Sequence, residues 1–87
     1  MDLFAKVVTL EGGYSSDEKK IRRSGYQIGD MFEVESIDMS QSYTTIYDAR
    51  DGDGYNSVYF EFYDEYGVEV DIYNDPIYNP YIGLFED

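Results

Sequence analysis

Polar and apolar side chains alternate with a period of two in three stretches of the chain, residues 31–35, 58–63 and 68–73. The inward positions are apolar: Phe32, Val34, Val58, Phe60, Phe62, Val68, Val70 and Ile72. The outward positions are acidic or tyrosine: Glu33, Glu35, Tyr59, Glu61, Tyr63, Glu69, Asp71 and Tyr73. Strict alternation of this kind is typical of antiparallel strands that bury one face and expose the other.

Two further segments complete the predicted sheet. Residues 3–10 form an apolar strand that ends at Gly12-Gly13, and residues 43–47 form a less regularly alternating one. The alternation slips in phase between Val34 and Ile37, which indicates a β-bulge.

The connections between these segments are short and rich in turn residues. Residues 51–54, Asp-Gly-Asp-Gly, and residues 64–67, Asp-Glu-Tyr-Gly, carry hairpin signals. Short strands separated by turns at near-regular spacing predict an all-β fold, a small five-stranded antiparallel barrel of SH3-like or OB-like type. A two-layer arrangement, with a sheet covered on one face by a short helix, is the alternative.

One segment has a different pattern. Residues 15–23 contain Ser15 and Glu18 at capping-box spacing, basic residues follow them, and Gly25 is placed to end a helix. We therefore expect a short helical insertion here, and a charged loop is the alternative because isolated short helices are marginal.

The C-terminal tail, residues 74–87, is rich in tyrosine and contains Pro76 and Pro80. Prolines lack the N–H group that a central strand needs, so we expect the tail to pack as an extended segment along an edge. Nothing divides the chain, and residues 1–87 are expected to form one domain.

Charge is distributed unevenly. The net charge is −13, and five of the six basic residues lie in the first 23 positions, so that Arg50 is the only one after them. A field of this sign repels nucleic acid and anionic membranes and attracts basic protein surfaces. The chain is therefore expected to be a protein-binding protein with no direct nucleic-acid contact.

Catalysis and metal binding find little support in the residues. With no histidine and no cysteine, the common general base and the thiol nucleophile are missing, so we expect neither an enzyme nor a cofactor. Asp48, Asp51, Asp53 and Asn56 cluster around two glycines, but the EF-hand spacing fails because position five, counted from Asp51, is Tyr55. A hairpin turn that uses Asp and Gly for local geometry explains this cluster better than calcium does.

A basic cluster lies in the predicted helical segment and consists of Lys19, Lys20, Arg22 and Arg23. Four charges compete poorly with the repulsion of the acidic remainder, so nucleic-acid binding is not expected from them. The cluster is expected to pair with the acidic face of the protein itself or with an acidic part of a partner.

The outward positions form the candidate site. On adjacent strands the partner-binding residues are expected to share one face: Glu33, Glu35, Tyr59, Glu61, Tyr63, Glu69, Asp71 and Tyr73. Carboxylates arrayed on a sheet offer a field comparable to that of phosphates, and tyrosines supply anchoring area at interfaces. Like charges side by side destabilise a sheet, so their presence favours a functional role. An ordinary solvated face is the alternative.

Localisation is expected to be cytoplasmic. The first residues place Asp2 where a signal peptide has a basic region, and no apolar run approaches the length of a membrane span.

Residues 28–34, Ile-Gly-Asp-Met-Phe-Glu-Val, are similar to the start of small SH3-like phage proteins, and the tyrosine-rich segment 71–76 adds a looser likeness. The chain thus resembles the short acidic accessory proteins encoded by bacteriophages of Gram-positive bacteria. The resemblance implies an anti-restriction or anti-CRISPR type of factor in the host cytoplasm.

Two functions follow. The first is an inhibitor that imitates DNA and occupies the nucleic-acid-binding surface of a host defence or DNA-handling protein. The second is a structural or assembly module of a phage complex that uses its tail for strand addition.

Overall fold

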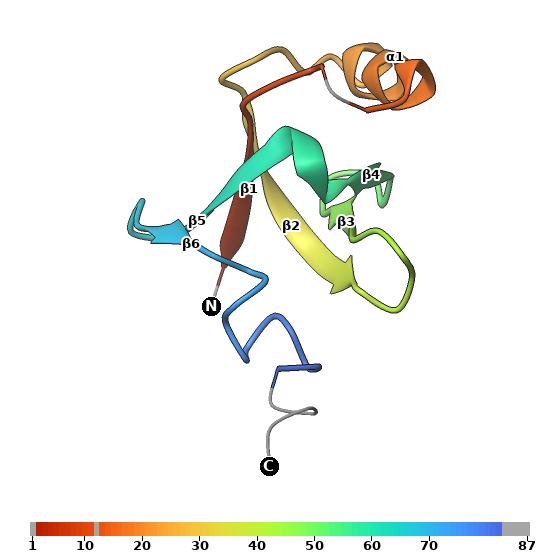
Figure 1. Ribbon diagram of the computed structural model, residues 1–87. Coiled ribbons are helices and arrows are strands. Elements are labelled where there is room, and N and C mark those ends of the chain that lie inside the picture. The colour runs from red at the N-terminus through yellow and green to blue at the C-terminus, as the bar shows by residue number, and fades with distance from the viewer. Residues whose placement is uncertain (1, 12, 83–87) are drawn as a thin grey trace.

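The computed structural model describes residues 2–11 and 13–82, which form one six-stranded antiparallel sheet with a single α-helix (Figure 1). The strand order is β4-β3-β2-β1-β5-β6. The strands are β1 (Leu3–Val7), β2 (Met31–Asp38), β3 (Thr45–Asp48), β4 (Gly54–Asn56), β5 (Phe60–Asp64) and β6 (Glu69–Val70). The helix is α1 (Ser15–Arg23), and a 3₁₀ turn, η1 (Ser57–Tyr59), precedes β5.

The mostly β character is confirmed, but a closed five-stranded barrel is not. The sheet is open, with the short strands β4 and β6 at its two edges. The expected strand 68–73 shrinks to Glu69–Val70 because the carboxylate of Asp71 accepts hydrogen bonds from the Tyr73 N–H and the Asn74 side-chain amide, which turns the chain away.

The predicted bulge lies in β2. Val34 pairs with Asp48, the next paired residue is Ser36 opposite Tyr47, and Glu35 is the extra residue between them. The residues before the bulge pair with β1 and those from Val34 onward pair with β3. The bulge therefore joins the two halves of the sheet, and a bulge increases the local twist of its strand.

The core lies on the inward face of this sheet. Its buried side chains come from every strand except β6, from α1 and η1, and from three connecting segments: Leu3, Ala5, Val7, Leu10, Ile21, Tyr26, Phe32, Ile46, Tyr55, Tyr59, Phe60, Phe62 and Ile72. Aromatic rings fill its centre, where Tyr26 stacks on Phe32 with ring centroids 4.9 Å apart. Burying one such side chain contributes about 1.5–3 kcal/mol, so each of these contacts matters in so small a domain.

The helix spans the predicted residues, but its expected capping box is absent. The N-cap residue is Tyr14, without a side-chain cap, and Glu18 instead forms a salt bridge of 3.0 Å with Arg22 one turn later. Gly25 follows the helix with a φ of 93°, a conformation that favours glycine. Ile21 is the buried residue of the helix and fixes it to the core.

The alternation predicted for residues 58–63 is wrong in its first two positions. The turn η1 interrupts it, because the Asn56 side chain accepts a hydrogen bond from the Val58 N–H and starts a 3₁₀ turn. Val58 is therefore exposed and Tyr59 buried, the reverse of the expectation. Val68 is also exposed, beside Gly67 in the turn that leads into β6.

The tail and the three residues that lead into it, Asp71, Ile72 and Tyr73, pack on the domain through turns. Asp71, Asp75 and Asn79 each accept a hydrogen bond from the N–H two residues later, at 3.1, 2.9 and 3.0 Å. Residues 74–82 thus differ from the extended segment that the prolines predict, because proline also suits the second position of a turn. Ile72 and Tyr78 carry the contact with the core.

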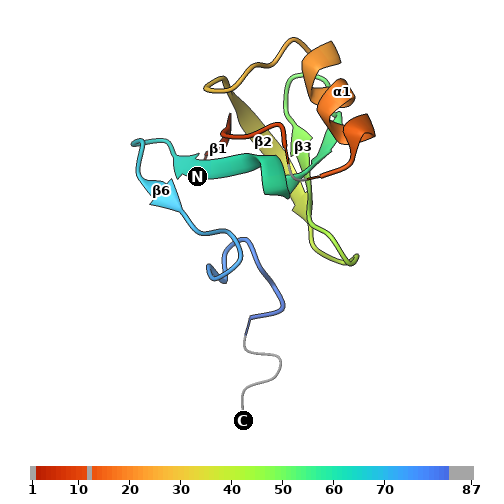
Figure 2. The ribbon, with the colours of Figure 1, turned by 45° about the horizontal axis from the view of Figure 1, so that its top comes forward.

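Figures 1 and 2 show the described part of the tail at the end of the molecule opposite α1. No helix in the described residues is both long enough and apolar enough to cross a bilayer.

Candidate functional site

Four side chains form a row across the outward face of the sheet. Phe4 on β1 lies opposite Glu33 on β2 and opposite Tyr63 on β5, and Tyr63 lies opposite Glu69 on β6. Residues directly opposite each other in a ladder project from the same face. The register therefore places three predicted site residues, Glu33, Tyr63 and Glu69, on one surface, which we call the acidic face.

The neighbouring row adds Glu61 and also a positive charge. Lys6 on β1 lies opposite Met31 and Glu61, so its ammonium group belongs to the same face. Phe4 and Lys6 are both partly exposed. Neither residue is among those predicted for the site, although their spacing of two within the first strand is the signal that locates them. The acidic face is thus mixed, with carboxylates around one lysine and one phenylalanine.

A groove of about 370 Å³ runs beside β5 at the edge of this face. Four of the predicted site residues line it: Glu61, Glu69, Asp71 and Tyr73. The groove exists because β6 pairs with Phe62 and Tyr63 and the chain then turns at Asp71. Phe60 and Glu61, the first residues of β5, therefore have no paired strand on that side within the described residues.

Hydrogen bonds hold several groups of the site in place. The Tyr63 hydroxyl donates to Glu61 Oε2 at 2.9 Å, and this bond, together with partial desolvation and the charges of Glu61 and Glu69, raises the pKa of Tyr63. The hydroxyl of Tyr73 shares a hydrogen bond with the buried Ser57 hydroxyl, while part of the Tyr73 ring stays exposed. Tyr63 and Tyr73 are thus ordered before any partner arrives.

Two predicted site residues lie elsewhere. Tyr59 is fully buried, its hydroxyl lies 3.4 Å from Asp17 Oδ2, and a Cβ on Gly13 would fall 1.7 Å from that hydroxyl. It is therefore a core residue, its burial raises its pKa, and the expectation of a surface anchor is wrong. Glu35 is exposed at the bulge and lines a different pocket, together with Ile77 and Tyr78.

The basic cluster of α1 pairs locally and not with the acidic face. Arg22 bonds to Glu18, and the Lys20 ammonium group donates to the Gly54 carbonyl at 2.6 Å. Lys19 and Arg23 are exposed on the helix. The expectation that the cluster pairs with the acidic face of its own protein is therefore wrong, and pairing with an acidic part of a partner stays a prediction.

The aspartates of residues 48–53 shape their hairpin loop, as the favoured interpretation predicts. Asp48 is buried, its carboxylate accepts hydrogen bonds from the Tyr26 hydroxyl and the Arg50 N–H, and Asp51 Oδ1 accepts one from the Asp53 N–H at 3.0 Å. Within the described residues no three acidic, histidine or cysteine side chains form a group that could hold a metal ion.

The fold and the site define a small, strongly acidic, mostly β protein with a charged sheet face and no membrane-spanning helix in the described residues. Residues 2–84 match the family described as Bacteriophage T4 protein Y07B, and the chain belongs to that family. No curated protein and no solved structure matches it. The family supports the expected phage origin, but it does not support a Gram-positive host, an SH3-like class, or an anti-restriction or anti-CRISPR type.

Proposed function

We propose that this phage protein binds a basic, nucleic-acid-binding surface of a host protein and blocks it. Glu33, Glu61, Glu69 and Asp71 stand in for phosphates, and Tyr63 and Tyr73 supply anchoring area. The observation that carries the proposal is the register of β2, β1, β5 and β6, which sets Glu33, Tyr63 and Glu69 in one row.

The dimensions of the row suit an extended polyanion mimic. Glu33 and Glu69 are separated by three strand spacings, which is about 14 Å of sheet. The net charge of −13 adds a long-range field that accelerates encounter with a positive surface. Lys6 lies within the face, so a partner has to match a mixed pattern of charge, which favours one orientation over others.

Tyrosine anchors complete the interface. Tyr63 and Tyr73 are held by Glu61 and Ser57, so little side-chain entropy is lost when they are covered. Pre-ordered aromatic side chains of this kind carry much of the binding energy in protein interfaces.

The experiment is a capture from host lysate on the immobilised full chain, followed by affinity measurement with the purified partner. The proposal predicts that the captured partner binds nucleic acid, that affinity falls steeply as salt rises, and that duplex DNA competes. The double variant Glu33→Lys with Glu69→Lys is expected to abolish binding. Both side chains are exposed, so the fold is expected to survive.

The matched control is Glu11→Lys with Asp53→Lys, which makes the same change of charge outside the acidic face. If this control retains affinity while the Glu33 and Glu69 double variant loses it, binding depends on the acidic face and not on the net charge alone. If both double variants bind equally well, or if DNA fails to compete, the proposed function is wrong.

Assembly through strand addition by the tail, the second function expected from the sequence, has less support. The backbone of residues 74–82 is folded into turns, and its N–H groups at Ile77, Tyr78 and Tyr81 already bond within the tail.

A further inference from the structure

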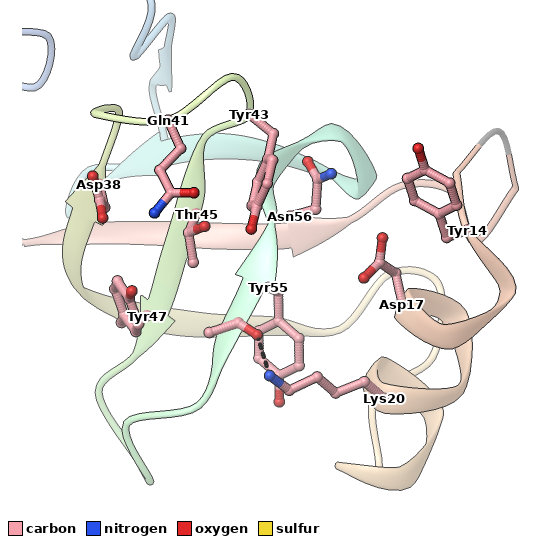
Figure 3. A pocket seen from close by; sticks show the side chains of 11 residues that line it. Tyr14, Asp17, Lys20, Asp38, Gln41, Tyr43, Thr45, Tyr47, Tyr55 and Asn56 are labelled. Atoms are coloured by element: carbon pink, nitrogen blue, oxygen red, sulfur yellow. Dashed lines mark hydrogen bonds between the residues drawn. The ribbon is translucent and has the colours of Figure 1, made fainter.

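A second concavity lies away from the acidic face. It is a cleft of about 490 Å³ between α1 on one side and β3, β4 and residues 39–44 on the other (Figure 3). We call it the tyrosine cleft, after four of its lining residues: Tyr14, Tyr43, Tyr47 and Tyr55. None of its residues belongs to the acidic face or to the groove beside β5.

Two of the rings are exposed, that of Tyr47 is partly exposed and that of Tyr55 is buried. Tyr14 immediately precedes the helix and is 78% exposed, and Tyr43, between β2 and β3, is 52% exposed. Figure 3 shows Tyr43 and Tyr55 between Asp17 and Lys20 on one side and Asp38 and Gln41 on the other. Two exposed tyrosines from separate segments that flank one hollow are typical of an interaction site.

The floor of the cleft requires a glycine. Gly54 lies opposite Tyr47 in the ladder, and a Cβ at Gly54 would be 2.9 Å from the Tyr47 ring and 3.0 Å from the Thr45 methyl group. The absence of a side chain at Gly54 therefore leaves room for the Tyr47 ring, which lines the cleft.

The charge of the cleft is negative. Asp17 and Asp38 line it, and the Asp38 carboxylate accepts hydrogen bonds from the Ser40 hydroxyl and N–H at 2.6 and 2.8 Å, which hold the pKa of Asp38 below its usual value. Lys20 is the basic residue among the described lining residues, and its ammonium group already donates to the Gly54 carbonyl.

The protein holds two of its own cations on tyrosine rings. The Lys20 ammonium group lies 5.5 Å from the centroid of Tyr55 inside the cleft. The Arg50 guanidinium lies 4.7 Å from the centroid of Tyr26 and also bonds to the Asp51 carboxylate and the Ser24 carbonyl. A tyrosine face with a nearby carboxylate or carbonyl is thus a cation site in this fold.

We propose that the tyrosine cleft binds an arginine side chain presented by an extended segment of a partner protein. A planar guanidinium stacks on tyrosine and donates to carboxylates at once, as Arg50 does within the chain. The free rings of Tyr14 and Tyr43 and the carboxylates of Asp17 and Asp38 offer the same groups to an external arginine. The high negative charge of the chain disfavours a nucleic acid strand in this position.

The test is a nuclear magnetic resonance titration of the full chain with the capped pentapeptide Ala-Ala-Arg-Ala-Ala. The control peptide carries citrulline, which has nearly the shape of arginine but no charge. Saturable shifts are expected at the Thr45 and Asn56 amides and at the Tyr14 and Tyr43 rings. The citrulline peptide is expected to bind about tenfold more weakly.

Tyr43→Ala is expected to weaken binding of the arginine peptide about fivefold, and Tyr66→Ala is the matched control. Tyr66 is 82% exposed in the turn between β5 and β6, so both variants remove an exposed tyrosine from a loop. Equal affinity for arginine and citrulline, shifts confined to the acidic face, or cleft binding of a thymidine oligonucleotide without a response to the arginine peptide would each overturn the proposal. These variants do not change the acidic face. A negative result with the arginine peptide would therefore overturn the cleft proposal alone, and the salt-dependent binding by the acidic face would still be tested separately.

Discussion

The hydroxyl of Tyr26 donates a hydrogen bond to the buried carboxylate of Asp48, and this contact joins the segment after α1 to the end of β3. Asp48 is nearly inaccessible, and its other oxygen accepts from the Arg50 N–H at 2.9 Å. The guanidinium of Arg50 lies 3.8 Å from the carboxylate and covers the Tyr26 ring. Burying a carboxylate costs free energy unless the group is hydrogen-bonded and paired with a positive charge. The stability of this arrangement therefore depends on both Tyr26 and Arg50.

Removing the Tyr26 hydroxyl is therefore expected to destabilise the fold. The Tyr26→Phe variant keeps the stacked ring but takes a donor from a buried charge, which lowers the free energy of unfolding by about 1.5–3 kcal/mol. Urea denaturation measures this. Tyr66→Phe removes the hydroxyl of an exposed tyrosine and is expected to leave stability unchanged. Equal midpoints for the two variants would show that the bond contributes nothing.

Alkaline pH is expected to destabilise the protein. Burial, and then the hydrogen bond to Asp48, raise the pKa of Tyr26, and burial also raises the pKa of Tyr55 and Tyr59. Tyrosines in the unfolded chain ionise near pH 10, at about their ordinary pKa. The stability from these residues is therefore complete below that pH and declines as the pH rises above it. Unfolding free energies measured from neutral to strongly alkaline pH test this, and a flat profile above the ordinary tyrosine pKa contradicts it.

The anchoring of the tail depends on Ile72. Its side chain is fully buried in the core, whereas Ile77 five residues later is 66% exposed. We expect Ile72→Ala to cost about 2–4 kcal/mol of stability and Ile77→Ala to have little effect. Thermal or urea unfolding compares the two, and similar losses would mean that the tail is fixed through another contact.

In the acidic face, Glu61→Gln is expected to lower the pKa of Tyr63 toward its usual value. The carboxylate of Glu61 accepts the Tyr63 hydroxyl at 2.9 Å and favours the protonated phenol. Ring resonances followed against pH report the change. Glu33→Gln is the control, because Glu33 lies on the far side of Phe4 from Tyr63. If the pKa of Tyr63 is the same in Glu61→Gln as in the unchanged protein, Glu61 does not control the ionisation of Tyr63.

Much of the sheet follows from local pattern. The alternation at 31–35, the phase slip before Ile37 and the helix at 15–23 are confirmed, because each is set by side-chain periodicity or by a local ending signal such as Gly25. Barrel closure was predicted from the number and spacing of strands. The structure differs because the side chains of Asn56 and Asp71 bond to nearby backbone and side-chain groups and turn the chain, which strand periodicity does not record.

The candidate site was predictable only in part, for a related reason. Glu33, Glu61 and Glu69 lie in regular strands, so their outward direction follows from the alternation. Tyr59 lies in η1, where the period of two fails, and it faces the core. The tyrosine cleft is composed of residues from three stretches of the chain, 14–20, 38–47 and 54–56, and only the fold brings these together.

The turns of the tail have a consequence for how the molecule opens. The hydrogen bonds accepted by the side chains of Asp71, Asp75 and Asn79 each span only two residues, but the Asn79 side-chain amide also donates to the Tyr73 carbonyl at 2.7 Å and joins the later turns to the first. Residues 80–82 can therefore fray first, residues 73–79 open together as one unit, and the buried Ile72 keeps this segment attached to the core. Amide hydrogen exchange along the tail should then fall off in steps toward Ile72 and meet the slow exchange of the sheet only there.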